Sequence, residues 1–141
     1  MFAVVIGCGR VGSTVATTLS TAGHSVVAVD RSQEALDNLP AEYSGFRLLG
    51  NGAERAIMDR ARMSDADVVV AATDDDNQNG LIALAARLVY SVARVVVRVQ
   101  NPGRVELLES YGITVVSPPE LAAQRVVEAI STNDRERAEV D

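Results

Sequence analysis

The sequence predicts an α/β fold: a parallel six-stranded sheet of order 3-2-1-4-5-6 with helices on both faces, a Rossmann-like doubly wound arrangement. Short valine-rich runs alternate with helical patterns along most of the 141 residues. A Gly-x-Gly-x-x-Gly loop joins the first run to the first helix, and the second run ends in an acid, Asp30. Hydrophobic residues make up 48% but aromatic residues only 4%, which suits a sheet of small aliphatic side chains covered on both faces.

The elements are expected in the following order. Strands are expected over residues 2–6, 25–29, 46–49, 67–71, 94–99 and 113–116. Helices are expected over residues 10–22, 32–39, 53–62, 77–90, 102–110 and 119–131. Gly23 and Gly112 fall where the first and fifth helices should end, because glycine readily adopts the left-handed conformation there. The strand order reverses between the first and fourth strands and opens a crevice beside the glycine loop.

Each glycine of the loop has its own expected role. Gly7 permits the tight turn out of the strand, Gly9 lets the backbone approach a pyrophosphate, and Gly12 lets the helix pack closely on the sheet. Backbone N–H groups and the positive end of the helix near Arg10 would face the phosphates. Asp30 follows at close to the spacing of about 20 residues at which an acid reaches ribose hydroxyls. The pattern predicts a dinucleotide or adenine nucleotide site, with a purely structural turn as the alternative.

Two further loops at strand ends border the same crevice. The turn Gly50-Asn51-Gly52-Ala53 either brings Asn51 to an adenine edge or serves only as a turn. The run after the fourth strand contains three aspartates, 74–76, which we interpret as helix caps rather than metal ligands because acids suit the first helical turn. Within that run, Thr73 and Asp74 are also expected to edge the crevice.

Arginines and acids near the crevice bear on the ligand's charge. Arg98, at the end of the fifth strand, would either neutralise a phosphate or pair with the aspartates 74–76. Arg10 lies inside the glycine loop, where it would meet any bound phosphate. Asp30 repels a 2′-phosphate and so disfavours NADP, although the adjacent Arg31 weakens that preference.

Composition excludes several other functions. The formal charge of −6 disfavours nucleic acid and anionic membranes as partners. No apolar run reaches the roughly 18–20 residues that span a bilayer, and the start of the chain does not resemble a signal peptide. The single cysteine, Cys8, fits a reducing, cytoplasmic compartment and has no basic neighbour to activate it. The chain contains one cysteine, Cys8, and one histidine, His24. It therefore lacks the residues for most Cys- and His-based catalytic or metal-binding sites, such as a histidine cluster or a Cys-x-x-Cys motif.

Two helices have more apolar surface than one sheet face requires. The helix over 77–90 is apolar nearly all round, which favours burial by the sheet on one side and by a partner on the other. The apolar stripe of the helix over 119–131 would either cover the sheet or cross to a second subunit. We expect one domain over residues 1–131, followed by a polar tail, 132–141, that is a frayed end or a linker.

Five segments together resemble the N-terminal lobe of RCK/KTN domains, the TrkA-N type, which regulate potassium channels and Trk/Ktr-type potassium uptake systems. These segments are the glycine loop with its arginine, Gly23-His-Ser-Val-Val-Ala-Val-Asp-Arg31, Thr73-x-x-Asp76-x-x-Asn79, Arg98-Val-Gln-Asn-Pro102, and Gly112-Ile-Thr-Val-Val-Ser-Pro118-x-x-Leu121-Ala-Ala123. The resemblance covers residues 2 to about 130, nearly the whole chain.

The resemblance implies a regulatory subunit and not an enzyme. Family members dimerise through the fourth and fifth helices, cross or exchange the sixth, and form rings on the cytoplasmic face of a membrane-embedded potassium transporter or channel. NAD(H), ATP or ADP in the crevice shifts the ring and thereby the pore. The implied nucleotide-binding residues of this chain are Gly7, Cys8, Gly9, Arg10, Val11, Gly12, Asp30, Arg31, Asn51, Gly52, Ala53, Ala72, Thr73, Asp74 and Arg98.

The chain also departs from the family pattern. Asn51 replaces an aspartate common in the family, so the charge at that turn is lost. Pro119 stands where some members have an acid near a divalent ion, and we therefore predict no metal site. Full members carry a second, C-terminal lobe that these residues do not include. The alternative function is the cofactor-binding half of an NAD-dependent oxidoreductase, and a weaker one is an interaction module without a ligand.

Overall fold

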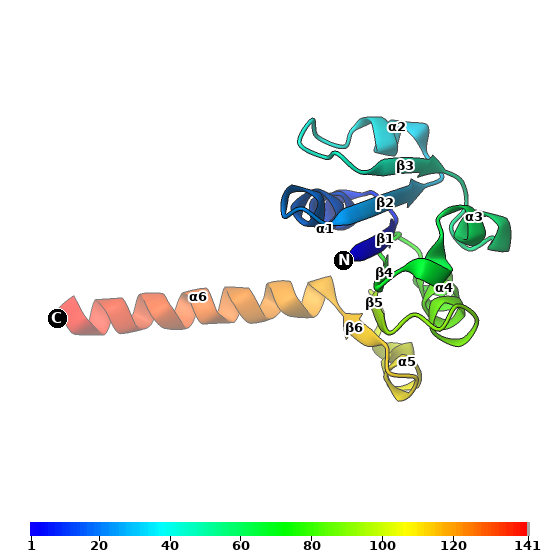
Figure 1. Ribbon diagram of the computed structural model, residues 1–141. Coiled ribbons are helices and arrows are strands. Elements are labelled where there is room, and N and C mark those ends of the chain that lie inside the picture. Colours follow the sequence, from blue (N-terminus) through cyan, green and yellow to red (C-terminus); the bar gives the residue numbers. More distant parts are fainter. Residues whose placement is uncertain (141) are drawn as a thin grey trace.

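The computed structural model describes residues 1–140 and confirms the predicted sheet (Figure 1). Its six strands are all parallel and lie in the order β3-β2-β1-β4-β5-β6. They are β1 (Phe2–Ile6), β2 (Ser25–Asp30), β3 (Phe46–Leu49), β4 (Val68–Ala71), β5 (Arg94–Arg98) and β6 (Thr114–Val116). The order reverses between β1 and β4, so the ends of these strands can border a shared crevice.

Six α-helices connect or follow the strands. They are α1 (Arg10–Thr21), α2 (Gln33–Asp37), α3 (Arg55–Arg60), α4 (Asp76–Leu88), α5 (Val105–Ser110) and α6 (Pro118–Val140). Helices α2 and α3 are shorter than expected, because Ser32 and Glu54 are caps before the first turn rather than helical residues. Gly23 and Gly112 have φ values of 90° and 76°, which confirms that α1 and α5 end in left-handed glycines.

Each face of the sheet has its own core. Val5 and Ala28 are neighbours on the face that α1 and α2 cover, while Ile6 and Val29 are neighbours on the face of α3, α4 and α5 (Figure 1). These residues are almost completely buried, and each large aliphatic side chain contributes about 1.5–3 kcal/mol by leaving water. The two cores fix the strand ends, and these ends position the loops of the crevice.

Helix α6 differs from the expectation in length and in position. It runs unbroken to Val140, so residues 132–140 are helical rather than frayed or extended. None of its residues is buried, and it leads away from the sheet (Figure 1). Of the two alternatives for this helix, covering the sheet does not hold in this structure, and crossing to a second subunit stays a prediction. Among residues 1–140, no helix combines the length and apolarity that a membrane crossing requires.

Candidate nucleotide-binding crevice

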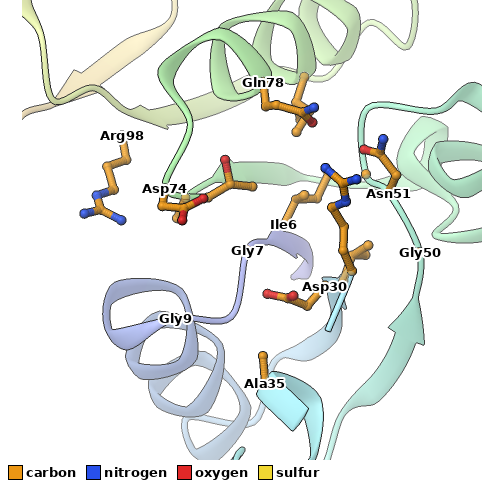
Figure 2. A pocket seen from close by; sticks show the side chains of 16 residues that line it. Ile6, Gly7, Gly9, Asp30, Ala35, Gly50, Asn51, Asp74, Gln78 and Arg98 are labelled. Atoms are coloured by element: carbon orange, nitrogen blue, oxygen red, sulfur yellow. The ribbon is translucent and has the colours of Figure 1, made fainter. Parts of the chain in front are cut away.

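A crevice of about 250 Å³ opens at the carboxyl ends of β1, β2 and β4 (Figure 2). It is lined by Ile6, Gly7, Gly9, Val29, Asp30, Arg31, Ala35, Gly50, Asn51, Gly52, Ala72, Thr73, Asp74, Gln78, Ile82 and Arg98. Figure 2 shows Arg98 and Asp74 at one side of it and Asn51 at the other. The crevice therefore lies where the reversal of strand order predicted it.

Most of the predicted site residues line this crevice. They are Gly7, Gly9, Asp30, Arg31, Asn51, Gly52, Ala72, Thr73, Asp74 and Arg98. The other predicted residues, which belong to the same loops but do not line it, are Cys8, Arg10, Val11, Gly12 and Ala53. Arg10 is the first residue of α1 and is exposed, so its contact with a phosphate stays a prediction.

Two glycines of the loop are required by the packing of the protein itself. Gly7 has a φ of 97°, and a Cβ at this residue would lie 2.5 Å from the backbone nitrogen of Thr73. A Cβ at Gly12 would overlap the carbonyl oxygen of Gly7, which confirms that Gly12 allows α1 to pack closely on β1. A Cβ at Gly9, by contrast, would meet no atom within 4 Å. Glycine at this position leaves space in the crevice and is not needed for packing.

The carboxylate of Asp30 joins the end of β2 to the glycine loop. One of its oxygens accepts a hydrogen bond from the backbone N–H of Cys8 at 2.7 Å, and the other accepts one from the N–H of Ser32 at 2.8 Å. The hydroxyl of Ser32 in turn caps α2 by accepting from the N–H of Ala35 at 3.2 Å. Asp30 is thus held at the edge of the crevice in a fixed orientation.

The thiol of Cys8 is buried beneath the glycine loop. Burial, together with the nearby carboxylate of Asp30, raises the pKa of Cys8 to about 12. The side chain is 5% exposed. A neutral and inaccessible thiol is a poor nucleophile, in agreement with the absence of an activating basic neighbour in the sequence.

Two of the three aspartates after β4 accept hydrogen bonds from backbone N–H groups. Asp75 caps α4 by accepting from the N–H of Gln78 at 3.0 Å, which confirms the capping interpretation. The two oxygens of Asp76 accept from the N–H groups of Gln100 and Asn101, at 2.8 and 2.9 Å. Asp74 is exposed and lines the crevice. Within residues 1–140, no group of three or more His, Cys, Asp or Glu side chains is arranged to hold a metal ion.

The guanidinium of Arg98 remains free of the aspartates 74–76. The ion pair found among residues 1–140 joins Arg62 to Asp65, at an exposed position, and does not involve Arg98. The Nε of Arg98 is buried and has no hydrogen-bond partner in the described part of the chain. Buried polar atoms are nearly always paired in native proteins. A guanidinium that lines the crevice and has no ion pair within residues 1–140 is suited to an anionic ligand.

The turn after β3 has its own internal hydrogen bonds. The side-chain oxygen of Asn51 accepts a hydrogen bond from the N–H of Ala53 at 3.0 Å. The backbone carbonyl oxygen of Asn51 accepts one from the N–H of Glu54, also at 3.0 Å. The amide nitrogen of Asn51 is left as a potential donor at the crevice. A Cβ at Gly52 would clash with Ile6, so this glycine is required where the turn crosses the end of β1.

The sequence reasoning missed six lining residues: Ile6, Val29, Ala35, Gly50, Gln78 and Ile82. Ile6 and Val29 stand at or near the ends of their strands, where the fold rule already predicts contact with a ligand. Gln78 and Ile82 are four residues apart on α4 and therefore share one face of that helix.

Comparisons with known proteins fit this geometry. The family model of the TrkA-N domain matches residues 3–119. A Trk system potassium uptake protein TrkA homolog from Methanothermobacter thermautotrophicus is 34% identical over 135 residues, which cover 96% of this chain and 62% of that protein. The chain thus spans about three fifths of the length of the first curated relatives it matches.

Solved structures show the same architecture. The TrkA-N domain of the inner membrane protein ybaL from Escherichia coli is 25% identical, with a TM-score of 0.81 over 91% of this chain and 95% of that one. The NAD(P)-binding domain of an exopolyphosphatase-related protein from Archaeoglobus fulgidus is 26% identical, with a TM-score of 0.76 over 92% and 97% of the two chains. Since the family model covers most of its length, this chain belongs to the TrkA-N domain family.

Proposed function

We propose that this chain is the nucleotide-binding part of a regulatory subunit that gates a potassium transporter or channel, with NAD(H), ATP or ADP in the crevice. One observation carries the proposal: a crevice at the reversal of strand order contains the unpaired cation Arg98 and an open space beside Gly9. Membership of the TrkA-N family and similarity to TrkA potassium uptake proteins support the regulatory role.

The residues present suit a nucleotide with phosphates. The start of α1 presents backbone N–H groups beside the open space at Gly9, and Arg98 supplies a positive charge at the same crevice. Asp30 has a fixed carboxylate for ribose hydroxyls. Ala35, which is partly exposed, provides apolar surface for a base, while Ile6 and Ile82 lie buried beneath the crevice, and the amide nitrogen of Asn51 provides a donor. A ligand with both a base and a phosphate uses all of these groups.

A regulator fits this crevice better than an oxidoreductase. The ionisable side chains that line it are Asp30, Arg31, Asp74 and Arg98. The Asp30 carboxylate already accepts two backbone hydrogen bonds, the arginines offer only donors, and Asp74 is exposed to water, so none of the four is held as a general acid or base is. A nucleotide can shift the equilibrium between two conformations only by its differential affinity for them. A tenfold difference contributes about 1.4 kcal/mol per site.

Exposed apolar side chains support assembly with a second copy and with a membrane partner. Leu81 and Leu88 on α4 are 57% and 59% exposed, and Leu121 and Ile130 on α6 are 55% and 57% exposed. Apolar surface of this kind is typical of protein–protein interfaces. We propose a homodimer or a larger ring that is cytoplasmic and is held at the inner face of the membrane by the potassium transporter or channel.

Ligand-induced stabilisation tests the proposal. Thermal unfolding would be followed with NAD⁺, NADH, NADP⁺, ATP and ADP, each over a concentration series. A ligand that binds only the folded protein stabilises it by about 2.7 kcal/mol at one hundred times its Kd. We expect this effect in the wild type and a much smaller one in Arg98→Ala. The matched control is Arg94→Ala, an exposed arginine at the opposite end of β5 and outside the crevice.

The outcomes separate the candidate functions. A ligand-induced rise in unfolding temperature that is lost in Arg98→Ala and kept in Arg94→Ala supports a nucleotide site with its phosphates near β5. No shift with any of the ligands refutes nucleotide binding by this chain and leaves the ligand-free interaction module. Steady consumption of NADH with a small carbonyl substrate would favour the oxidoreductase.

A further inference from the structure

We propose that Asn79 is a positioning residue for nucleotide binding, because its buried side chain ties the end of β4 to the end of β5 and thereby sets Thr73 relative to Arg98. The inference rests on the proposed function, since it concerns the wall of the same crevice. Thr73 and Arg98 both line the crevice, whereas Asn79 does not. Asn79 would therefore act on the ligand only through these two residues.

The carboxamide of Asn79 has its full set of hydrogen bonds. Its oxygen accepts from the backbone N–H and the hydroxyl of Thr73, at 2.9 and 2.6 Å. Its nitrogen donates to the carbonyl oxygens of Thr73 and Arg98, at 2.9 and 3.0 Å. The side chain is 0% exposed. Both donors and the acceptor oxygen are satisfied, so the carboxamide has one well-defined orientation.

Helix formation does not account for asparagine at this position. Asparagine is a weaker helix former than alanine, and a buried amide is costly unless all of its polar atoms are paired. The neighbouring buried residues of α4 include Ile82, Ala83 and Ala86, as expected for a side that faces the sheet. What the amide adds is a connection between two parallel strands just beyond their ladder, where each strand enters its loop.

Asp76, one turn earlier on α4, makes a second connection to the same segment. Its carboxylate accepts from the N–H groups of Gln100 and Asn101, immediately after β5. The first turn of α4 thus holds the backbone on both sides of Val99. Asn79 thus fixes the backbone carbonyl of Arg98, the residue whose side chain lines the crevice.

Asn79→Asp tests the connection with little change in shape. The new carboxylate still accepts from Thr73, but it cannot donate to the carbonyl oxygens of Thr73 and Arg98 and instead repels them. We expect ADP to bind at least ten times more weakly than to the wild type at pH 8, by titration calorimetry. Asn77→Asp is the matched control, because it makes the same substitution at an exposed residue of the same turn, and it should stay within twofold of the wild type.

Acidification provides a second readout that a general loss of packing would not produce. Burial beside carbonyl oxygens raises the pKa of a carboxyl group, and its protonated form regains one donor. The difference in ADP affinity between Asn79→Asp and the wild type should therefore narrow at pH 5.5. The other charged groups in this network, Arg98 on β5 and Asp75 and Asp76 on α4, are common to both proteins, so comparison at each pH removes their effects.

The outcomes distinguish this inference from the function on which it rests. If the wild type binds ADP and Asn79→Asp binds it equally well, or the difference does not change with pH, the positioning role is overturned and the nucleotide site stands. If the wild type binds none of the nucleotides, both fail. If Asn79→Asp does not fold at pH 8, the ADP affinity of Asp76→Asn is measured instead. A loss of threefold or more in ADP affinity supports the role of the first turn of α4, and an unchanged affinity overturns it.

Discussion

Replacing Gly9 with alanine should separate nucleotide binding from folding. Gly9 caps α1 with φ and ψ of −73° and −156°, an extended conformation that alanine also adopts. The added Cβ would have no neighbour within 4 Å. Alanine lowers the entropy of the unfolded chain, worth about 0.4–1 kcal/mol, but is a poorer helix cap than glycine. These effects oppose each other, so the free energy of unfolding should change by less than about 1 kcal/mol.

The comparison variant is Gly12→Ala, in the same loop. There the added Cβ would overlap the carbonyl oxygen of Gly7, a backbone atom that can move only if α1 shifts away from β1. Overpacking of this kind costs about 1–3 kcal/mol, and a clash with backbone belongs at the upper end of that range. Gly12→Ala should therefore lower the urea midpoint clearly, whereas Gly9→Ala should leave it almost unchanged.

Urea unfolding with and without ADP measures both effects. At one hundred times its Kd, ADP should stabilise the wild type by about 2.7 kcal/mol. If the methyl group at Gly9 occupies the space that the phosphates need and raises the Kd a hundredfold, the same ADP concentration stabilises Gly9→Ala by only about 0.4 kcal/mol. Our reasoning is refuted if Gly9→Ala is as unstable as Gly12→Ala, or if it keeps the full stabilisation by ADP.

Further predictions concern Cys8, Arg98 and Ile130. Cys8 should react with a disulfide reagent at pH 8 far more slowly in the folded protein than in urea, since a pKa of about 12 leaves almost no thiolate; equal rates would contradict its burial. The thiol of Cys8 stays protonated to higher pH in the folded protein than in the unfolded chain. The free energy of unfolding should therefore fall as the pH rises from about 9 toward 12, and Cys8→Ala should make this fall smaller. Arg98→Ala should weaken ADP binding about tenfold or more and leave adenosine binding unchanged in calorimetry; an equal loss for both would place the guanidinium away from the phosphates. Ile130→Glu should change the free energy of unfolding of the monomer by less than about 0.5 kcal/mol, because no residue of α6 is buried, while light scattering should show less self-association; a clear loss of monomer stability would disprove the exposed position of α6.

The central strands β1, β2 and β4 were predictable because most of their residues are buried on both faces of the sheet. The expected bounds of β1 match the structure, since a continuous apolar run that ends in a glycine loop leaves few alternatives. The expected bounds of β3 also match, although this edge strand contains Arg47 and is mostly exposed. The ends of short helices were harder to predict. Helix α3 ends before Arg62, which has a φ of 59°. A left-handed conformation at a residue other than glycine comes from tertiary packing and has no local signal.

The crevice was predictable as a location more than as a set of contacts. Gly7, Asp30, Thr73 and Arg98 stand at strand ends, and parallel strands bring their carboxyl ends to one edge. Gln78 was missed because a sequence pattern alone does not show which residues of the first turn of α4 face the crevice. The role of Asp76 was hidden as well, because its partners, 100 and 101, are backbone groups of a distant segment.

Helix α6 is long and exposed, although several of its side chains are apolar. Its 23 residues would extend over about 35 Å, yet none is buried by the rest of the chain. A helix without tertiary contacts is only marginally stable in water, and most helical stability in proteins comes from burying an apolar face. Leu121, Val126 and Ile130 would each contribute about 1.5–3 kcal/mol if they were fully buried. A second copy that covered these side chains would supply the stability that the isolated chain lacks, and we therefore expect α6 to be most stable in an assembly.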